Sequence, residues 1–178
     1  MVKPFTLHQF VEEYIAELVN LIKKGSVRGS RSDKSLSAAD MTFCFNIACY
    51  NIVRRREKAL QFEGKVGRGG FTDLTIYPSH AAKNALIQIE HENGTAKAIA
   101  KAVKRLLSKG VDAEYRLLLT YYDTDKEPSA ESIKKTFVEL AKNQPKTYLL
   151  LGKDDCDKKN LFTLFDQKGK TLFEKSGE

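Results

Sequence analysis

The stretch FTDLTIYPSHAAKNALIQIEHEN, residues 71–93, contains two short apolar runs that predict two neighbouring β-strands. Acidic residues interrupt both runs, with Asp73 in the first and Glu90 and Glu92 in the second. Because side chains alternate between the two faces of a strand, the apolar residues share one face and the acids the other. The acids therefore either line a metal-binding site or lie on a face that is exposed to water.

The sequence around this stretch predicts a mixed arrangement of helices and strands. Residues 6–24 predict a helix, because Thr6 and Gln9 have capping-box spacing and an apolar stripe follows them. Ser37 is a good N-cap for a second, largely apolar helix that continues to about residue 58. The further expected elements are two strands within 59–78 joined by a glycine-rich turn, a strand at 84–92, a helix at 95–110, a strand at 113–123, a helix at 130–142, a strand at 146–153 and a hairpin turning near Gly169.

Composition is typical of a globular protein, with 178 residues, 42% of them hydrophobic and 30% charged. We expect one domain over residues 1–178, since no stretch resembles a linker. The apolar runs are too short to cross a membrane and the N-terminus has no long apolar segment, so we expect a cytoplasmic protein. Cys44, Cys49 and Cys156 lack zinc-finger or CxxC spacing, which favours reduced thiols without a structural zinc.

The net charge of +7 favours polyanionic partners such as nucleic acid, because neutralised phosphates release counterions. Charge alone is only a mild indication, since many basic proteins bind no nucleic acid. Residues 25–35, rich in Gly and Ser, carry Arg28, Arg31 and Lys34. This composition predicts a solvated loop, and the functional alternative is a basic arm that closes on a phosphate backbone.

Together, the acids and the order of elements resemble the PD-(D/E)xK nuclease superfamily. Its core is a helix, three antiparallel strands, a helix and a further strand, and the resemblance covers roughly residues 38–122. The family's Asp corresponds to Asp73 and its first strand-three acid to Glu90. Thr72 replaces the usual Pro, and Glu92 replaces the usual Lys, giving the D…ExE variant. The resemblance implies an α/β fold: a restriction-endonuclease-like mixed β-sheet flanked by helices (αβββαβ core), with an N-terminal helix and a C-terminal β-hairpin.

The resemblance also implies an activity, that of a metal-dependent DNA endonuclease using Mg²⁺ or Mn²⁺. Asp73 and Glu90 would be metal ligands, and Glu92 would act as a base or bind a second ion. Many family members add a Glu from the first core helix, for which Glu57 is the candidate and Glu63 the substitute. Nothing in the local sequence marks either as more than a surface acid.

Other residues near the motif have two interpretations each. His91 alternates away from the acids, which favours a packed histidine, whereas Gln88 shares their face and would contact phosphate or water. The lysines on the outer side of the helix at 95–110 form a solvated face or contact DNA. Basic residues in the glycine-rich turn clamp a phosphate or simply accompany a tight turn. The candidate nucleic-acid-binding residues are Arg28, Arg31, Lys65, Arg68, Lys97 and Lys101.

Other catalytic signatures are missing: the glycine-rich segment GKVGRGG, residues 64–70, is not a phosphate loop because it lacks the required GK[ST], and the sequence has no G-x-S-x-G and no H-E-x-x-H. The main alternative is a non-catalytic nucleic-acid-binding or assembly protein on the same fold. A third hypothesis is a different α/β protein whose acids simply face solvent. Cutting both DNA strands calls for two active sites, which a homodimer would supply. The apolar C-terminal hairpin, residues 160–175, would pack on its own sheet or on such a partner.

Overall fold

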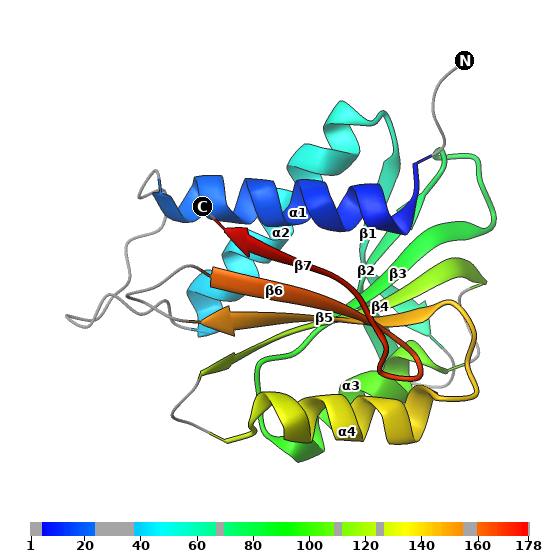
Figure 1. The fold of residues 1–178 in the computed structure, drawn as a ribbon. Helices are drawn as coiled ribbons and strands as arrows, with labels where there is room; N and C mark the ends of the chain where they lie inside the picture. The colour runs from blue at the N-terminus through cyan, green and yellow to red at the C-terminus, as the bar shows by residue number, and fades with distance from the viewer. Residues whose placement is uncertain are drawn as a thin grey trace.

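A seven-stranded mixed sheet runs through the molecule, with helices on both of its faces (Figure 1). The computed structural model describes residues 5–23, 38–66, 70–108, 112–123, 127–154 and 160–177. The helices are α1 (Leu7–Lys23), α2 (Ala38–Arg55), α3 (Ala96–Leu106) and α4 (Ala130–Ala141). The strands are β1 (Ala59–Val66), β2 (Gly70–Tyr77), β3 (Ala85–His91), β4 (Ala113–Asp123), β5 (Thr147–Asp154), β6 (Asn160–Asp166) and β7 (Thr171–Gly177).

The strands lie in the sheet in the order in which they occur along the chain. The pairs β1–β2 and β2–β3 are antiparallel, β3–β4 and β4–β5 are parallel, and β5–β6 and β6–β7 are antiparallel. The two parallel pairs need long crossovers, and α3 and α4 provide them. The expected α/β class, the mixed sheet, the N-terminal helix and the C-terminal hairpin are confirmed.

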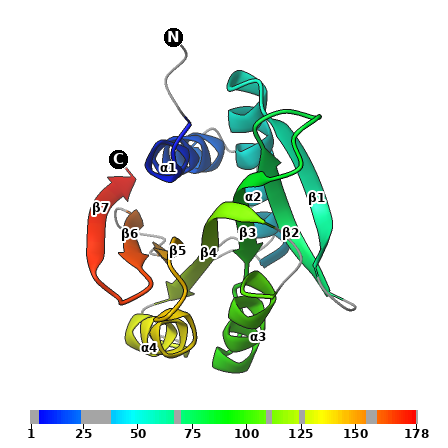
Figure 2. The ribbon, with the colours of Figure 1, turned by 90° about the vertical axis from the view of Figure 1, so that its right-hand side faces the viewer.

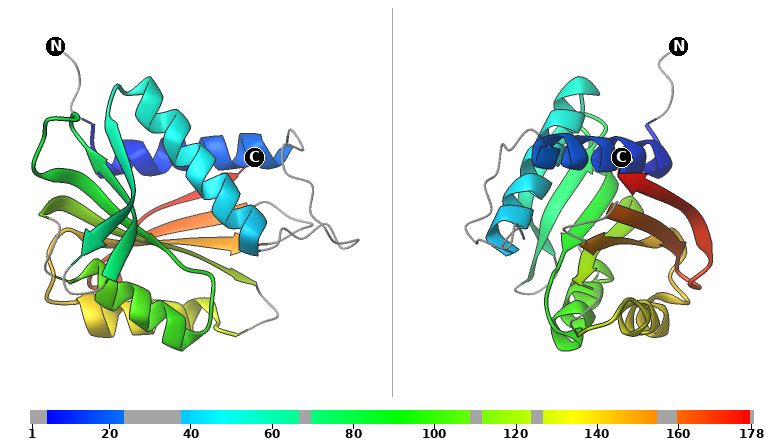
Figure 3. Two further views of the ribbon diagram at one scale, coloured as in Figure 1. Left: turned by 180° about the vertical axis from the view of Figure 1, so that it is seen from behind. Right: turned by 60° about the vertical axis from the view of Figure 1, so that its left-hand side comes forward.

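The helices divide into two pairs, one on each face of the sheet (Figure 2). One core cluster joins α1 and α2 to side chains such as Leu74, Ile89 and Leu119. The other joins α3 and α4 to side chains such as Leu118 and Leu149. Seen from behind, α2 lies across the end of the sheet that contains β1 and β2 (Figure 3). Each face of the central strands therefore has a helical cover.

Local sequence signals explain where three of the helices begin. At α1, Gln9 N donates to Thr6 Oγ1 at 3.3 Å and Thr6 N donates to Gln9 Oε1 at 3.2 Å, which is the predicted capping box. Thr95 caps α3 and Ser129 caps α4, each accepting a backbone N–H at 3.3 Å. The N-cap expected at Ser37 lies outside the described residues.

The first helix contacts parts of the chain that come much later. The hydroxyls of Tyr14 and Tyr121 are 2.5 Å apart, and the ring centroids of His8 and Phe173 are 4.7 Å apart. Ion pairs also link α1 to the end of α2, joining Glu17 to Arg55 and Glu13 to Arg55 and Arg56. Thus α1 closes one side of the main core against both α2 and the C-terminal strands.

The C-terminal hairpin follows one of the two alternatives expected for it. Phe162, Leu164 and Phe165 are buried, so the hairpin packs mainly on its own sheet, although Leu172 is exposed. Cys44 and Cys49 are buried in the core, and Cys156 lies outside the described residues. No helix in the part of the chain that the structure describes is long and apolar enough to cross a membrane.

One of the two alternatives for the face that carries the acids, exposure to water, does not hold for the residues at its centre. Thr75, Gln88 and Glu90 have no exposed surface. The crossover helix α3 covers this face with its buried side, which includes Ile99 and Val103. The alternation of β3 alone had indicated that Gln88 would contact water or a phosphate. Because it is fully buried, it can contact neither bulk water nor a phosphate.

Candidate functional site

The candidate site begins where β2 and β3 stop pairing. Their last backbone pair in this direction is Leu74 with Ile89. Beyond it, the backbone N–H of His91 donates to Oδ2 of Asp73 at 2.8 Å. A side-chain carboxylate thus continues the contact between the strands and fixes Asp73 beside β3. Glu90 is the residue just before His91 on β3. The register of β2 and β3 therefore places Asp73 and Glu90 next to each other.

Glu90 is fully buried and holds an ion pair with α3. Arg105 donates to Oε2 of Glu90 from Nε at 2.9 Å and from Nη2 at 2.8 Å. A buried carboxylate is costly unless it is paired and hydrogen-bonded, and this contact supplies both. Arg105 keeps 27% of its side chain exposed, so it extends from the buried acid to the surface.

Glu92 reaches the same neighbourhood from the end of β3. Its backbone N–H donates to the carbonyl of Leu119 at 3.1 Å, which holds this segment against β4. Its half-buried side chain lies over Gly94, where an added Cβ would be 2.9 Å from Oε1 of Glu92. Gly94 therefore makes room for this carboxylate just before α3 begins.

The charges of all three motif acids affect the pKa of Arg105. Burial lowers its pKa, but the hydrogen bond to Glu90 and the negative charges of Glu90, Asp73 and Glu92 together raise the pKa above its usual value. When all four groups are ionised, one guanidinium faces three carboxylates. The site thus has a net negative charge, which attracts a cation.

The helix acids expected to complete the site lie differently. Glu57 is exposed in the turn after α2, with a φ of 52°. Glu57 comes just before Ala59, which pairs with Tyr77 on β2. Along an extended strand, Tyr77 is about 13 Å from Asp73. The structure therefore does not bring Glu57 to the other acids. Glu63 lies on β1 at the register position opposite Asp73, and its side chain is outside the described part of the chain.

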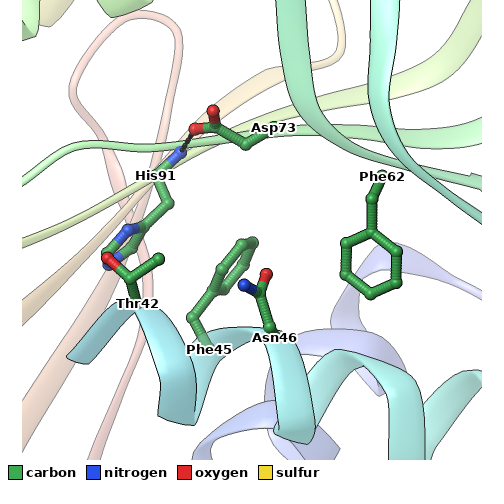
Figure 4. A pocket seen from close by; sticks show the side chains of 6 residues that line it. All are labelled: Thr42, Phe45, Asn46, Phe62, Asp73 and His91. Atoms are coloured by element: carbon green, nitrogen blue, oxygen red, sulfur yellow. Dashed lines mark hydrogen bonds between the residues drawn. The ribbon is translucent and has the colours of Figure 1, made fainter. Parts of the chain in front are cut away.

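An open pocket of about 510 Å³ lies on the other side of Asp73. Figure 4 shows the space between α2 and the strands, with Asp73 and Phe62 at its edges. The ring of His91 stacks on Phe45, with centroids 4.8 Å apart and an interplanar angle of 9°. The lining residues are Thr42, Phe45 and Asn46 from α2, Phe62 from β1, Asp73 from β2 and His91 from β3.

His91 is a packed histidine, as the alternation of β3 predicts. Burial lowers its pKa from 6.5 to about 4, so the ring is neutral at pH 7. Its Nε2 is 3.4 Å from Nδ2 of Asn93, whose Oδ1 accepts the backbone N–H of Tyr121 at 3.0 Å. These contacts fix the end of β3 on which Glu90 and Glu92 lie.

Sequence reasoning missed two groups of this site, Arg105 and Asn46. Arg105 borders the apolar stripe of α3 formed by Ala102 and Leu106. A long basic side chain beside a buried stripe was the sequence signal that could have identified it. Asn46 is a polar residue within a largely apolar helix, which was the corresponding signal in α2. Neither signal identifies what the residue faces in the fold, since Arg105 pairs with Glu90 on β3 and Asn46 lines a pocket with residues from three strands.

The candidate nucleic-acid-binding residues are only partly described. Lys97 and Lys101 are exposed on the outer side of α3, as predicted. The side chain of Lys65 and all of Arg28, Arg31 and Arg68 lie outside the described residues.

The donor set around Asp73 suits a small, hard divalent cation. Within the described ranges, no group of three or more His, Cys, Asp or Glu side chains is arranged to hold a metal ion. Mg²⁺, however, keeps several waters and commonly uses only one or two carboxylates. Asp73 and Glu90 are two such carboxylates, of which Asp73 is half-buried and Glu90 is fully buried and paired with Arg105.

No protein-family model matches the chain, and no curated protein sequence is significantly similar to it. What the chain does must therefore be inferred from the chemistry of Asp73, Glu90 and their neighbours.

Proposed function

We propose that this chain is a metal-dependent DNA endonuclease with a restriction-endonuclease-like fold of the PD-(D/E)xK type. The observation that carries the proposal is the position of Asp73 beside Glu90 where β2 and β3 part. The elements from α2 to β4 occur in the order helix, three strands, helix, strand, which is the order expected for that fold. The positive net charge of +7 supports a polyanionic substrate.

Asp73 and Glu90 would hold Mg²⁺, or Mn²⁺ in its place. When bound, the ion supplies Lewis-acid charge at the phosphate and lowers the pKa of a bound water. The His91 N–H orients Asp73, so the carboxylate needs little rearrangement to act as a ligand. Arg105 orients Glu90 and keeps 27% of its side chain exposed, so it would attract a phosphate to this site. Glu92 would accept the proton of the attacking water, since it is the half-buried acid at the edge of the site.

A second candidate is a non-catalytic nucleic-acid-binding or assembly protein on this fold. The observation that favours it is the double contact of Arg105 with one oxygen of Glu90. A buried acid that is already paired in this way can serve stability alone. In that case the exposed Lys97 and Lys101 would contribute to binding without any cleavage.

Cleavage assays on matched variants separate the two candidates. The full chain is incubated with supercoiled plasmid, a linear duplex and single-stranded DNA, each with Mg²⁺, Mn²⁺ or a chelator. Asp73→Asn removes the proposed ligand, and Asp112→Asn, an exposed acid between α3 and β4, is the control. The nuclease proposal expects metal-dependent cutting by the wild type and Asp112→Asn and none by Asp73→Asn. Binding without cutting in every metal would favour the second candidate.

A further inference from the structure

The pocket next to Asp73 has walls of two kinds. Its aromatic walls are Phe62 on β1 and Phe45 on α2, and the ring of His91 already covers one face of Phe45. Its polar walls are the side-chain amide of Asn46 and the hydroxyl of Thr42 (Figure 4). An amide offers both a hydrogen-bond donor and an acceptor, so the pocket can bind a flat ring by its face and by its edge.

Exposed aromatic side chains lie on two of the elements that line this pocket, α2 and β1. Within the described part of the chain, the large hydrophobic side chains that are exposed are Phe43, Tyr50, Phe62 and Leu172, and only Leu172 is not on α2 or β1. Phe62 lines the pocket with 47% of its surface exposed. Phe43 and Tyr50, 54% and 52% exposed, lie one helical turn to either side of Asn46 and therefore on its side of α2. Aromatic rings left in water beside an open pocket are typical of surfaces on which bases stack.

The charge of the lining determines which part of a nucleic acid fits. The described residues that line the pocket include no Lys or Arg, but they include the acidic Asp73. Among these described residues a phosphate would meet a carboxylate and no cation, so this part of the pocket does not suit the backbone. A nucleobase is neutral, flat and edged with donors and acceptors, and it suits both the aromatic and the amide walls.

We propose that this pocket receives one unpaired nucleobase of the substrate, stacked on Phe62 and hydrogen-bonded by Asn46. A base inside a duplex is stacked on both faces and paired along its edge, so it cannot enter such a pocket unless it leaves the helix. The substrate at this site is therefore single-stranded or locally unpaired. The inference rests on the proposed function, because the base would enter next to Asp73 and its phosphate would lie near the acids.

The test measures binding in a chelator, so that cleavage plays no part in it. The probes are a single-stranded oligonucleotide carrying a fluorescent purine analogue and a blunt duplex of the same sequence. The full-length variants are Phe62→Leu and Asn46→Ala, with Leu172→Ala as a matched control for an exposed apolar residue on β7. Circular dichroism and thermal melts verify that every variant is folded.

The expected result is tighter binding of the single strand than of the duplex, with a change in the fluorescence of the analogue. Phe62→Leu and Asn46→Ala should each weaken single-strand binding about tenfold, and Leu172→Ala should not. Equal affinity for both probes, or binding unaffected by both pocket variants, would overturn the inference. Self-association that Phe62→Leu abolishes, without any preference for single strands, would also overturn it and assign the aromatic residues to a contact between copies.

These outcomes are independent of the fate of the proposed function. If no metal supports cleavage but the pocket variants weaken single-strand binding, the nuclease proposal fails and the base pocket stands. If Asp73 is required for cutting and Phe62→Leu alters neither cutting nor binding, the nuclease proposal stands and the base pocket fails.

Discussion

Arg105 on α3 and Glu90 on β3 form an ion pair in which two guanidinium nitrogens, at 2.8 and 2.9 Å, contact one carboxylate oxygen. The acid is fully buried and the arginine reaches the surface. In the family that the sequence resembles, the cation of the motif lies two residues after the second acid on the same strand. Here that position is Glu92, and the cation next to the acids comes from the crossover helix instead.

Arg105→Met should destabilise the fold, because it leaves the charge of Glu90 buried without this partner. We expect the free energy of unfolding to fall by about 3 kcal/mol, measured by urea denaturation. Lys104→Met removes the same charge from the exposed side of α3 and should change stability by less than about 0.5 kcal/mol. The double variant Glu90→Gln/Arg105→Met should recover part of the loss. Equal effects of the two single variants would contradict a specific role for the ion pair.

Glu92→Gln should reduce cleavage about a hundredfold while leaving the fold intact, if Glu92 accepts the proton of the attacking water. Plasmid nicking at saturating Mg²⁺ measures the rate, and Glu139→Gln, an exposed acid on α4, is the control. Glu92→Lys restores the residue that is common in the family, and retained cutting would show that a cation can serve at this position. Unchanged rates in both Glu92 variants would mean that the residue has no catalytic role.

Replacing buried polar groups beneath α3 should stabilise the protein. Neither amide atom of Gln88 nor the hydroxyl of Thr75 has a hydrogen-bond partner among the described residues, and both side chains are fully buried. Gln88→Met and Thr75→Val keep the approximate shape, so each should raise the free energy of unfolding by about 1 kcal/mol in urea titrations. A loss of stability in Gln88→Met would show instead that its amide is satisfied by an internal water.

The neutral, buried His91 should make the protein less stable in mild acid. Its pKa is about 4 in the folded state against 6.5 ordinarily, so between these pH values the unfolded chain binds a proton that the folded chain does not. Stability therefore falls as the pH is lowered from 6.5 to 4, by at most about 1.4 kcal/mol per pH unit, and His91 adds no pH dependence above 6.5. Urea titrations across this range should show a shallower slope for His91→Phe. Identical slopes would place the acid sensitivity elsewhere.

The sequence predicted the features that depend on neighbouring residues. The capping box of Thr6 and Gln9 is a short-range signal and is confirmed, and the helices expected at 95–110 and 130–142 begin within a residue or two of their expected starts. The inward direction of His91 followed from strand alternation in the same way.

Features that depend on packing between distant segments were not predictable in this way. Alternation places Gln88 and Glu90 on one face of β3, but only the position of α3 decides that this face is dry. Arg105 reaches Glu90 across the crossover, and nothing in either local sequence specifies that contact. Glu57 looked suitable on the helix before β1, but the antiparallel register of β1 and β2 puts that end of the helix next to Tyr77.

The contacts of α1 also constrain the order in which native contacts can form during synthesis of the chain. This helix leaves the ribosome before any other element described here, yet Tyr14 contacts Tyr121 on β4 and His8 contacts Phe173 on β7. Its apolar side therefore has only part of its native cover, chiefly that from α2, until the C-terminal strands have been synthesised. During most of translation α1 thus depends on α2 for its native contacts. Native docking of the first helix becomes one of the last events of folding.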